Sequence, residues 1–71
     1  MRIIKINTEY IKLQQLLKLS NISNSGSDIK YYISKNMIKL NGNIVSERGK
    51  KIRNNDIVEI ENINVIKVKQ I

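Results

Sequence analysis

The spacing of apolar residues changes along the chain, and each change predicts a new element. Ile4 and Ile6 are two residues apart and would share one face of a strand, so residues 2–6 are predicted to form a short strand. Three leucines then recur at helical spacing and predict a helix near residues 12–20. A second stripe, with spacing i, i+3, i+4, begins at Ile29 and predicts another helix near residues 26–35. Asn36 follows this helix and is suited to end it, because Asn accepts the left-handed backbone conformation.

From Met37 onward the apolar period is two, which is typical of strands. Asn41-Gly42 favours a tight hairpin turn, because both positions accept a positive φ. A basic loop is expected over residues 48–53. The first and last strands are expected to pair, and Lys67 and Lys69 are typical of the charged edge of a sheet. The strands expected in this half of the chain cover residues 38–40, 43–46, 56–61 and 65–71.

These elements predict the α+β class, with two short helices packed on a small, mostly antiparallel β-sheet in the order β-α-α-β-β-β-β. The length of 71 residues is that of one small domain, so we expect residues 1–71 to form a single domain. Cys and His are both absent from the sequence. Thiol and imidazole catalysis and the ordinary zinc sites are therefore excluded, and we expect no enzyme, no metal and no cofactor.

The charge of the chain points to a polyanionic partner. The net charge is +7 at pH 7, from 13 Lys and Arg against 6 Asp and Glu. Residues 29–53 hold seven basic residues and one acidic residue, a net +6, whereas residues 54–71 hold two basic and three acidic residues, a net −1. The longest apolar run is three residues and no secretory signal is visible, so a cytoplasmic protein is expected.

An ordered series of features over residues 12–61 resembles the RNA-binding domain of small-subunit ribosomal protein S-four, also called the αL motif. Over its whole length the chain is similar to the small stand-alone bacterial YaaA-type proteins. The resemblance implies an RNA-binding domain with no enzyme attached, and the YaaA type implies binding or assembly of the large ribosomal subunit. The matching features are Lys12-Leu13, Ser25, the strand ending in Asn41-Gly42, the basic segment Arg48 to Arg53 and the strand that follows Asp56.

The residues themselves indicate the same kind of site. Free backbone N–H groups at the start of the second helix form a ready phosphate site, and Ser25 is expected to open this helix. The S-four family has an Arg where this chain has Gly26, and Lys30 is expected to cover the same phosphate. Tyr31 is the tyrosine expected to be exposed. The expected RNA-binding residues are Lys12, Ser25, Ser27, Lys30, Arg48, Lys50, Lys51 and Arg53.

We therefore expect a non-catalytic monomer that binds structured rRNA of the large subunit or its precursor, without a membrane or a small-molecule substrate. One alternative is a ribosome rescue or quality-control factor that binds the same subunit with tRNA. An alternative of another class is a small β-grasp carrier or protein-interaction module, since M-I-K-L-N-G also opens such chains. Those carriers need a C-terminal Gly-Gly, whereas this chain ends in Lys-Gln-Ile. Neither helix has the aromatic-rich apolar face that binding to anionic lipid requires.

Overall fold

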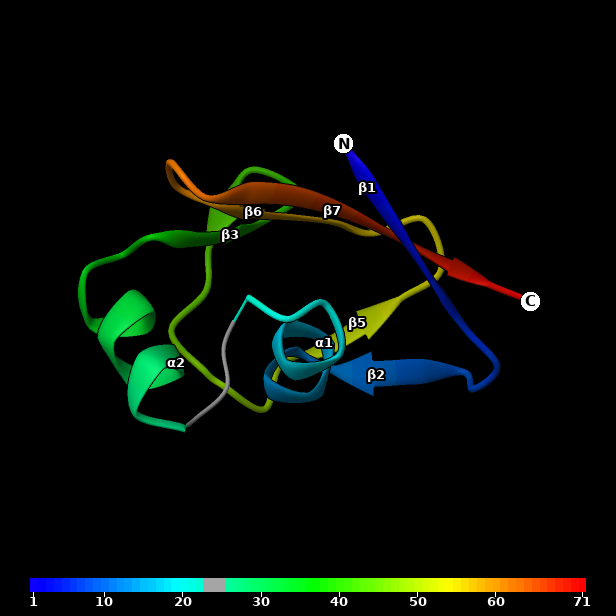
Figure 1. Cartoon of the computed structure of the whole chain (residues 1–71), viewed down its shortest axis with the longest axis horizontal. Helices are drawn as coiled ribbons and strands as arrows, with labels where there is room; N and C mark the ends of the chain where they lie inside the picture. Colours follow the sequence, from blue (N-terminus) through cyan, green and yellow to red (C-terminus); the bar gives the residue numbers. More distant parts are fainter. Residues whose placement is uncertain (23–25) are drawn as a thin grey trace.

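The computed structural model describes residues 1–22 and 26–71 (Figure 1). Strands and helices follow one another in the α+β pattern that the sequence predicts, with two additional short strands, one before the first helix and one within the expected basic loop. The elements are β1 (Arg2–Ile6), β2 (Tyr10–Lys12), α1 (Leu13–Leu19), α2 (Gly26–Ser34), β3 (Ile38–Leu40), β4 (Asn43–Ile44), β5 (Lys51–Arg53), β6 (Ile57–Ile60) and β7 (Asn64–Gln70).

Five of these strands form one sheet in the order β1-β7-β6-β3-β4. The predicted pairing of the first and last strands is confirmed: β1 runs parallel to β7, with Ile4 opposite Val68. The other strand pairs of this sheet are antiparallel. The prediction that Lys67 and Lys69 lie at a sheet edge is wrong, because β1 adds to the outer side of β7 and makes it an interior strand.

The second sheet is a ribbon of two short antiparallel strands, β2 and β5. Its strand β2 was not expected, and the last three residues of the expected basic loop are strand β5. Each strand has only three residues, which is too short for a periodic pattern to show in the sequence. The ribbon forms because two segments far apart in the chain pair with each other.

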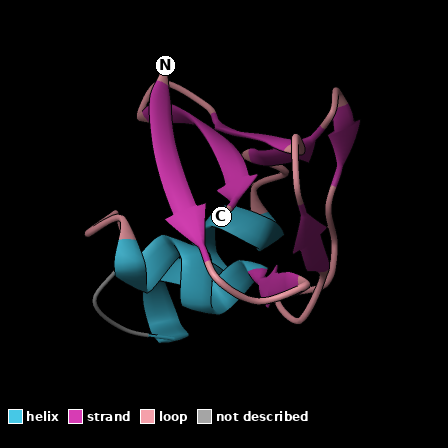
Figure 2. Cartoon of the chain, turned by 90° about the vertical axis from the view of Figure 1, so that its right-hand side faces the viewer, coloured by secondary structure: helices cyan, strands magenta, loops and turns pink. Residues whose placement is uncertain are grey.

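Both helices lie on the same side of the five-stranded sheet, and the ribbon lies beside α1 (Figure 1). Figure 2 shows the strands curving over the packed helices. At the end of α1, the Arg2 guanidinium donates a hydrogen bond to the Ser20 carbonyl and ties β1 to the helix. The core between these layers consists of Ile4, Ile6, Leu13, Leu16, Leu17, Ile29, Ile38, Val45, Ile52, Val58, Ile60, Ile66 and Val68.

Asparagine supplies most of the left-handed turn positions of the described chain. Asn36 has φ 55° after α2, which confirms that it ends this helix. Asn41 and Gly42 have φ 50° and 89°, as the predicted hairpin turn between β3 and β4 requires. Asn55 has φ 69° between β5 and β6. These turns fix where each strand begins, and they therefore position the charged side chains described below.

Candidate nucleic-acid interface

The ribbon formed by β2 and β5 has one charged face and one apolar face. Its register places Tyr10 opposite Arg53 and Lys12 opposite Lys51. Side chains alternate between the two faces of a strand, so these four residues share one face, which we call the basic ribbon face. On the other face Ile52 is fully buried in the core. Lys12, Lys51 and Arg53 are exposed, so the basic ribbon face is open to a partner.

The ring of Tyr10 attracts two of the three cations on the basic ribbon face. Lys51 Nζ lies 4.8 Å from the ring centroid, and the guanidinium carbon of Arg53 lies 5.6 Å from it. Both distances fall within the range of cation–π attraction. The Thr8 hydroxyl donates a hydrogen bond to the Tyr10 carbonyl at 2.8 Å and fixes the backbone that enters β2. Tyr10 therefore gathers two long basic side chains at one place on the ribbon.

Lys12 and Lys51 are direct cross-strand neighbours on this face. Like charges in directly opposite positions of two strands destabilise a sheet. An anion bound between the two ammonium groups would relieve their repulsion and would form charge-assisted hydrogen bonds with both. The pair is therefore suited to a phosphate group.

The basic segment before β5 is hydrogen-bonded to the start of α1. The Leu13 N–H donates to the Lys50 carbonyl at 2.8 Å, and the Gln14 N–H donates to the Arg48 carbonyl at 3.1 Å. The first N–H groups of a helix have no partner within the helix, and here the protein itself supplies their acceptors. These bonds hold the exposed residues Arg48 and Lys50 beside the first turn of α1, next to Lys12.

A side-chain network fixes the other end of the ribbon. The Arg53 N–H donates to Asp56 Oδ2 at 2.7 Å, and Asn41 Nδ2 donates to Asp56 Oδ1 at 3.1 Å. The Ile57 N–H in turn donates to Asn41 Oδ1 at 2.9 Å. Asn41 lies in the predicted turn, and it also connects the β3–β4 hairpin to the segment that carries Arg53. The network therefore holds the backbone of Arg53 in place.

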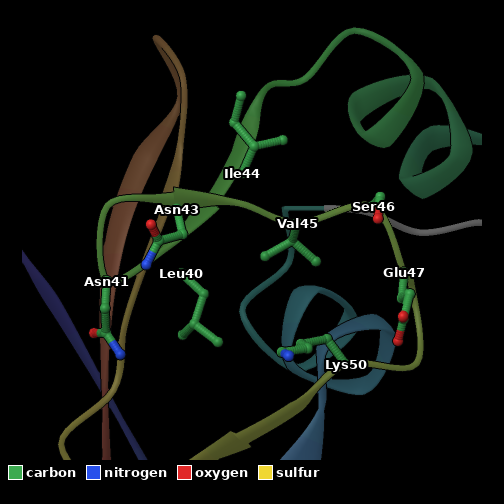
Figure 3. Close-up of a pocket in the computed structure, with 8 residues that line it drawn as sticks. All are labelled: Leu40, Asn41, Asn43, Ile44, Val45, Ser46, Glu47 and Lys50. Carbon is green, nitrogen blue, oxygen red and sulfur yellow. The ribbon is translucent and has the colours of Figure 1, made fainter.

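A hollow lies between the β3–β4 hairpin and the segment before β5 (Figure 3). The side chain of Lys50 extends toward the middle of the hollow in this view. The hollow therefore borders the basic segment, and a ligand group that entered it would lie near the Lys50 side chain. Its lining consists of Leu40, Asn41, Asn43, Ile44, Val45, Ser46, Glu47 and Lys50.

The structure gathers five of the eight predicted RNA-binding residues around the ribbon and the start of α1. Lys30 is exposed on α2, an element separate from the ribbon. Ser25, its expected capping interaction and the side chain of Ser27 lie outside the described residues. The five gathered residues are Lys12, Arg48, Lys50, Lys51 and Arg53.

Tyr31 on α2 is exposed, as expected, with 55% of its surface accessible. Its ring contacts Tyr32 edge-to-face at 6.0 Å, and Lys35 Nζ lies 6.0 Å from its centroid. Tyr32, which belongs to the predicted apolar stripe that begins at Ile29, packs against the core. The sequence did not single out Tyr10, although the polar–apolar–polar pattern that it begins is repeated at Lys51 to Arg53.

Among residues 1–22 and 26–71, no helix is long and apolar enough to cross a membrane. The same residues contain no group of three or more acidic side chains placed to hold a metal ion. The basic ribbon face presents three cations and one aromatic ring. This chemistry suits phosphate groups in a nucleic acid.

The fold and the basic ribbon face are suited to a protein that binds nucleic acid. The chain belongs to the S4 domain family, whose model matches residues 4–69. It is 37% identical over 65 residues to the protein named "Probable ribosome maturation protein RlbA" of Bacillus subtilis (strain 168), an alignment that covers 92% of each chain. The resemblance to the S-four domain is thus confirmed.

Proposed function

We propose that this protein is a non-catalytic cytoplasmic factor that binds rRNA of the large ribosomal subunit, or of its precursor, during ribosome assembly. The observation that carries the proposal is the basic ribbon face, where three cations share one side of the ribbon with a half-buried ring and two of them lie over that ring. The S4 domain family gives this face an RNA partner, and the name of the Bacillus subtilis relative gives ribosome maturation as the process. We propose that residues 1–71 act as one domain and as a monomer.

The mode of binding follows from the side chains on the ribbon. Lysine ammonium groups bind phosphates as point charges, whereas the Arg53 guanidinium can hold two phosphate oxygens at once. These contacts position a protein on RNA without reading its bases. A folded RNA offers closely spaced backbones that several cations can contact together. We therefore infer that the protein recognises the shape of a folded rRNA segment.

The test of the site compares two variants that each lose two positive charges. Lys12→Gln/Lys51→Gln removes the opposed pair on the ribbon. Lys18→Gln/Lys35→Gln removes two cations outside the ribbon, one in α1 and one just after α2. Each lost phosphate contact is expected to reduce the slope of log affinity against log salt by about 1, so the ribbon variant should lose about 2. The probe is large-subunit rRNA transcribed in vitro.

Equal affinities of the two variants for this rRNA would refute the ribbon as the site. The subunit is tested in the cell extract by sedimentation, followed by crosslinking and sequencing of the bound RNA. We expect co-migration with the large subunit or its precursors and crosslinks at one rRNA site. A protein that stays at the top of the gradient, or that crosslinks mainly to tRNA, would contradict the proposed assembly role.

A further inference from the structure

The five-stranded sheet has one face that the helices do not cover. The helices and the ribbon pack on its other side (Figure 1), where Ile4, Ile66 and Val68 are buried. Alternation along the strands turns the residues between these positions outward. On β1 and β7 the outward residues include Lys5, which is exposed, and Lys67, which is half-buried. We call the residues of this uncovered side the outer sheet face: Ile3, Lys5, Lys39, Ile44, Ile57, Glu59, Val65, Lys67 and Lys69.

Positive charge is concentrated at the β1–β7 side of the outer sheet face. Lys5 stands directly opposite Lys69, and Lys67 lies between Ile3 on β1 and Ile57 on β6. Lys69 Nζ donates to Asn55 Oδ1 at 2.7 Å, which holds its ammonium group at the end of the face. The opposed lysines destabilise the free protein, since like charges in directly opposite positions repel.

Acidic residues do not balance these three lysines. Within the strand residues that the structure describes, Glu59 is the acidic member of the face, and its direct neighbours are Lys39 and Val65. Glu59 lies on β6, with Lys39 on β3 directly opposite it and Lys67 on β7 diagonal to it, whereas Lys69 lies further along β7 and Lys5 lies on β1. The β1–β7 side keeps an uncompensated charge that a polyanion would neutralise.

We propose that the outer sheet face is a second RNA-binding surface, which takes the phosphate backbone of a duplex segment. This inference rests on the proposed function: the basic ribbon face holds one RNA segment and the outer sheet face holds another. The face carries lysines and aliphatic side chains and, among its described residues, no aromatic ring on which bases could stack. Sheets that bind single-stranded RNA use such rings, so this face is suited to a backbone.

The positions of the two surfaces determine how far apart two bound RNA segments would lie. The ribbon and the outer sheet face both point away from the core, and Figure 1 shows the helices below the sheet, on the side of the ribbon. The molecule measures 32 × 23 × 19 Å. Two RNA segments bound to the two surfaces would therefore be held about one protein thickness apart. The protein would act as a bridge between two parts of a folding rRNA.

The experiment measures bridging directly. The probes are two short RNA duplexes, one with a donor fluorophore and one with an acceptor, mixed with the full-length chain. We expect energy transfer, and native mass spectrometry should show complexes of one protein with two duplexes. Lys5→Gln/Lys67→Gln should bind one duplex and lose the energy transfer. Lys18→Gln/Lys35→Gln carries the same net charge and should bridge like the wild type.

Several outcomes would overturn this inference. It is wrong if the wild type binds a single duplex, or if Lys5→Gln/Lys67→Gln bridges as well as its control. It is also wrong if bridging complexes contain two proteins, because the protein would then join the duplexes through contacts with itself. Failure of the proposed function looks different: Lys12→Gln/Lys51→Gln would then bind RNA as tightly as the wild type. Thermal unfolding serves to check that the lysine variants are folded. Lys5→Gln should not lower the midpoint temperature of unfolding.

Discussion

Replacement of Tyr10 by Leu removes the ring beside Lys51 and Arg53 and leaves an apolar side chain in its place. Two cation–π contacts are lost, at 4.8 Å and 5.6 Å from the ring centroid. At about 0.5–1 kcal/mol for each contact, Tyr10→Leu should lower the free energy of unfolding by about 1–2 kcal/mol. Affinity for RNA should also fall, because each freed side chain costs about 0.5–1.5 kcal/mol to order again on binding.

Urea denaturation measures the first effect, and Tyr10→Phe is the matched control. Phe keeps the ring and loses the hydroxyl, so it should stay within about 0.5 kcal/mol of the wild type. A double-mutant cycle of Tyr10→Leu with Lys51→Gln should give a coupling energy of about 0.5–1 kcal/mol. A coupling energy of zero would refute the contact between the ring and Lys51. A loss in Tyr10→Phe equal to that in Tyr10→Leu would assign the effect to the hydroxyl.

Two further predictions concern the backbone and the hydrogen bonds that position the ribbon. Gly42→Ala should destabilise by about 1 kcal/mol because Gly42 has φ 89°, whereas Gly49→Ala, which also has open space around it, should be neutral or slightly stabilising in urea denaturation. Asn41→Gly keeps the positive φ but removes the bonds to Asp56 and Ile57, so it should cost about 1–3 kcal/mol. An unchanged free energy of unfolding in Asn41→Gly would show that the hydrogen-bond network contributes nothing to stability. Equal losses of stability in Gly42→Ala and Gly49→Ala would show that the positive φ of Gly42 is not the cause of the destabilisation.

Most of the fold could be predicted from the sequence because most elements carry their own local signal. The strand expected over residues 2–6 is β1, and the helices expected near 12–20 and 26–35 contain α1 and α2. The hairpin followed from Asn41-Gly42, whose φ angles in the structure are both positive. In each case the spacing of a few apolar residues, or the backbone preference of one pair, is sufficient to fix the conformation.

The ribbon could not be predicted in the same way. Strands β2 and β5 have three residues each, and the segments Tyr-Ile-Lys and Lys-Ile-Arg have too few positions to show a period. What stabilises them is mutual pairing and the burial of Ile52 between distant parts of the chain. The sequence consequently showed the basic residues but not the two strands that present Lys12, Lys51 and Arg53. It also missed Tyr10, whose role depends on which residues stand opposite it.

The net charge of each chain segment did not reveal the lysines of the outer sheet face, because their common position also depends on which residues stand opposite one another. Residues 54–71 have a net charge of −1, yet Lys67 and Lys69 join Lys5 on one side of a sheet. A count by segment averages over both faces of every strand, whereas a partner meets only one. The register of β7 decides which face carries the lysines: a shift of one residue would turn them into the core and expose Ile66 and Val68. Burial of a lysine is far too costly for that arrangement, so the same packing that forms the core places the lysines on the outer sheet face.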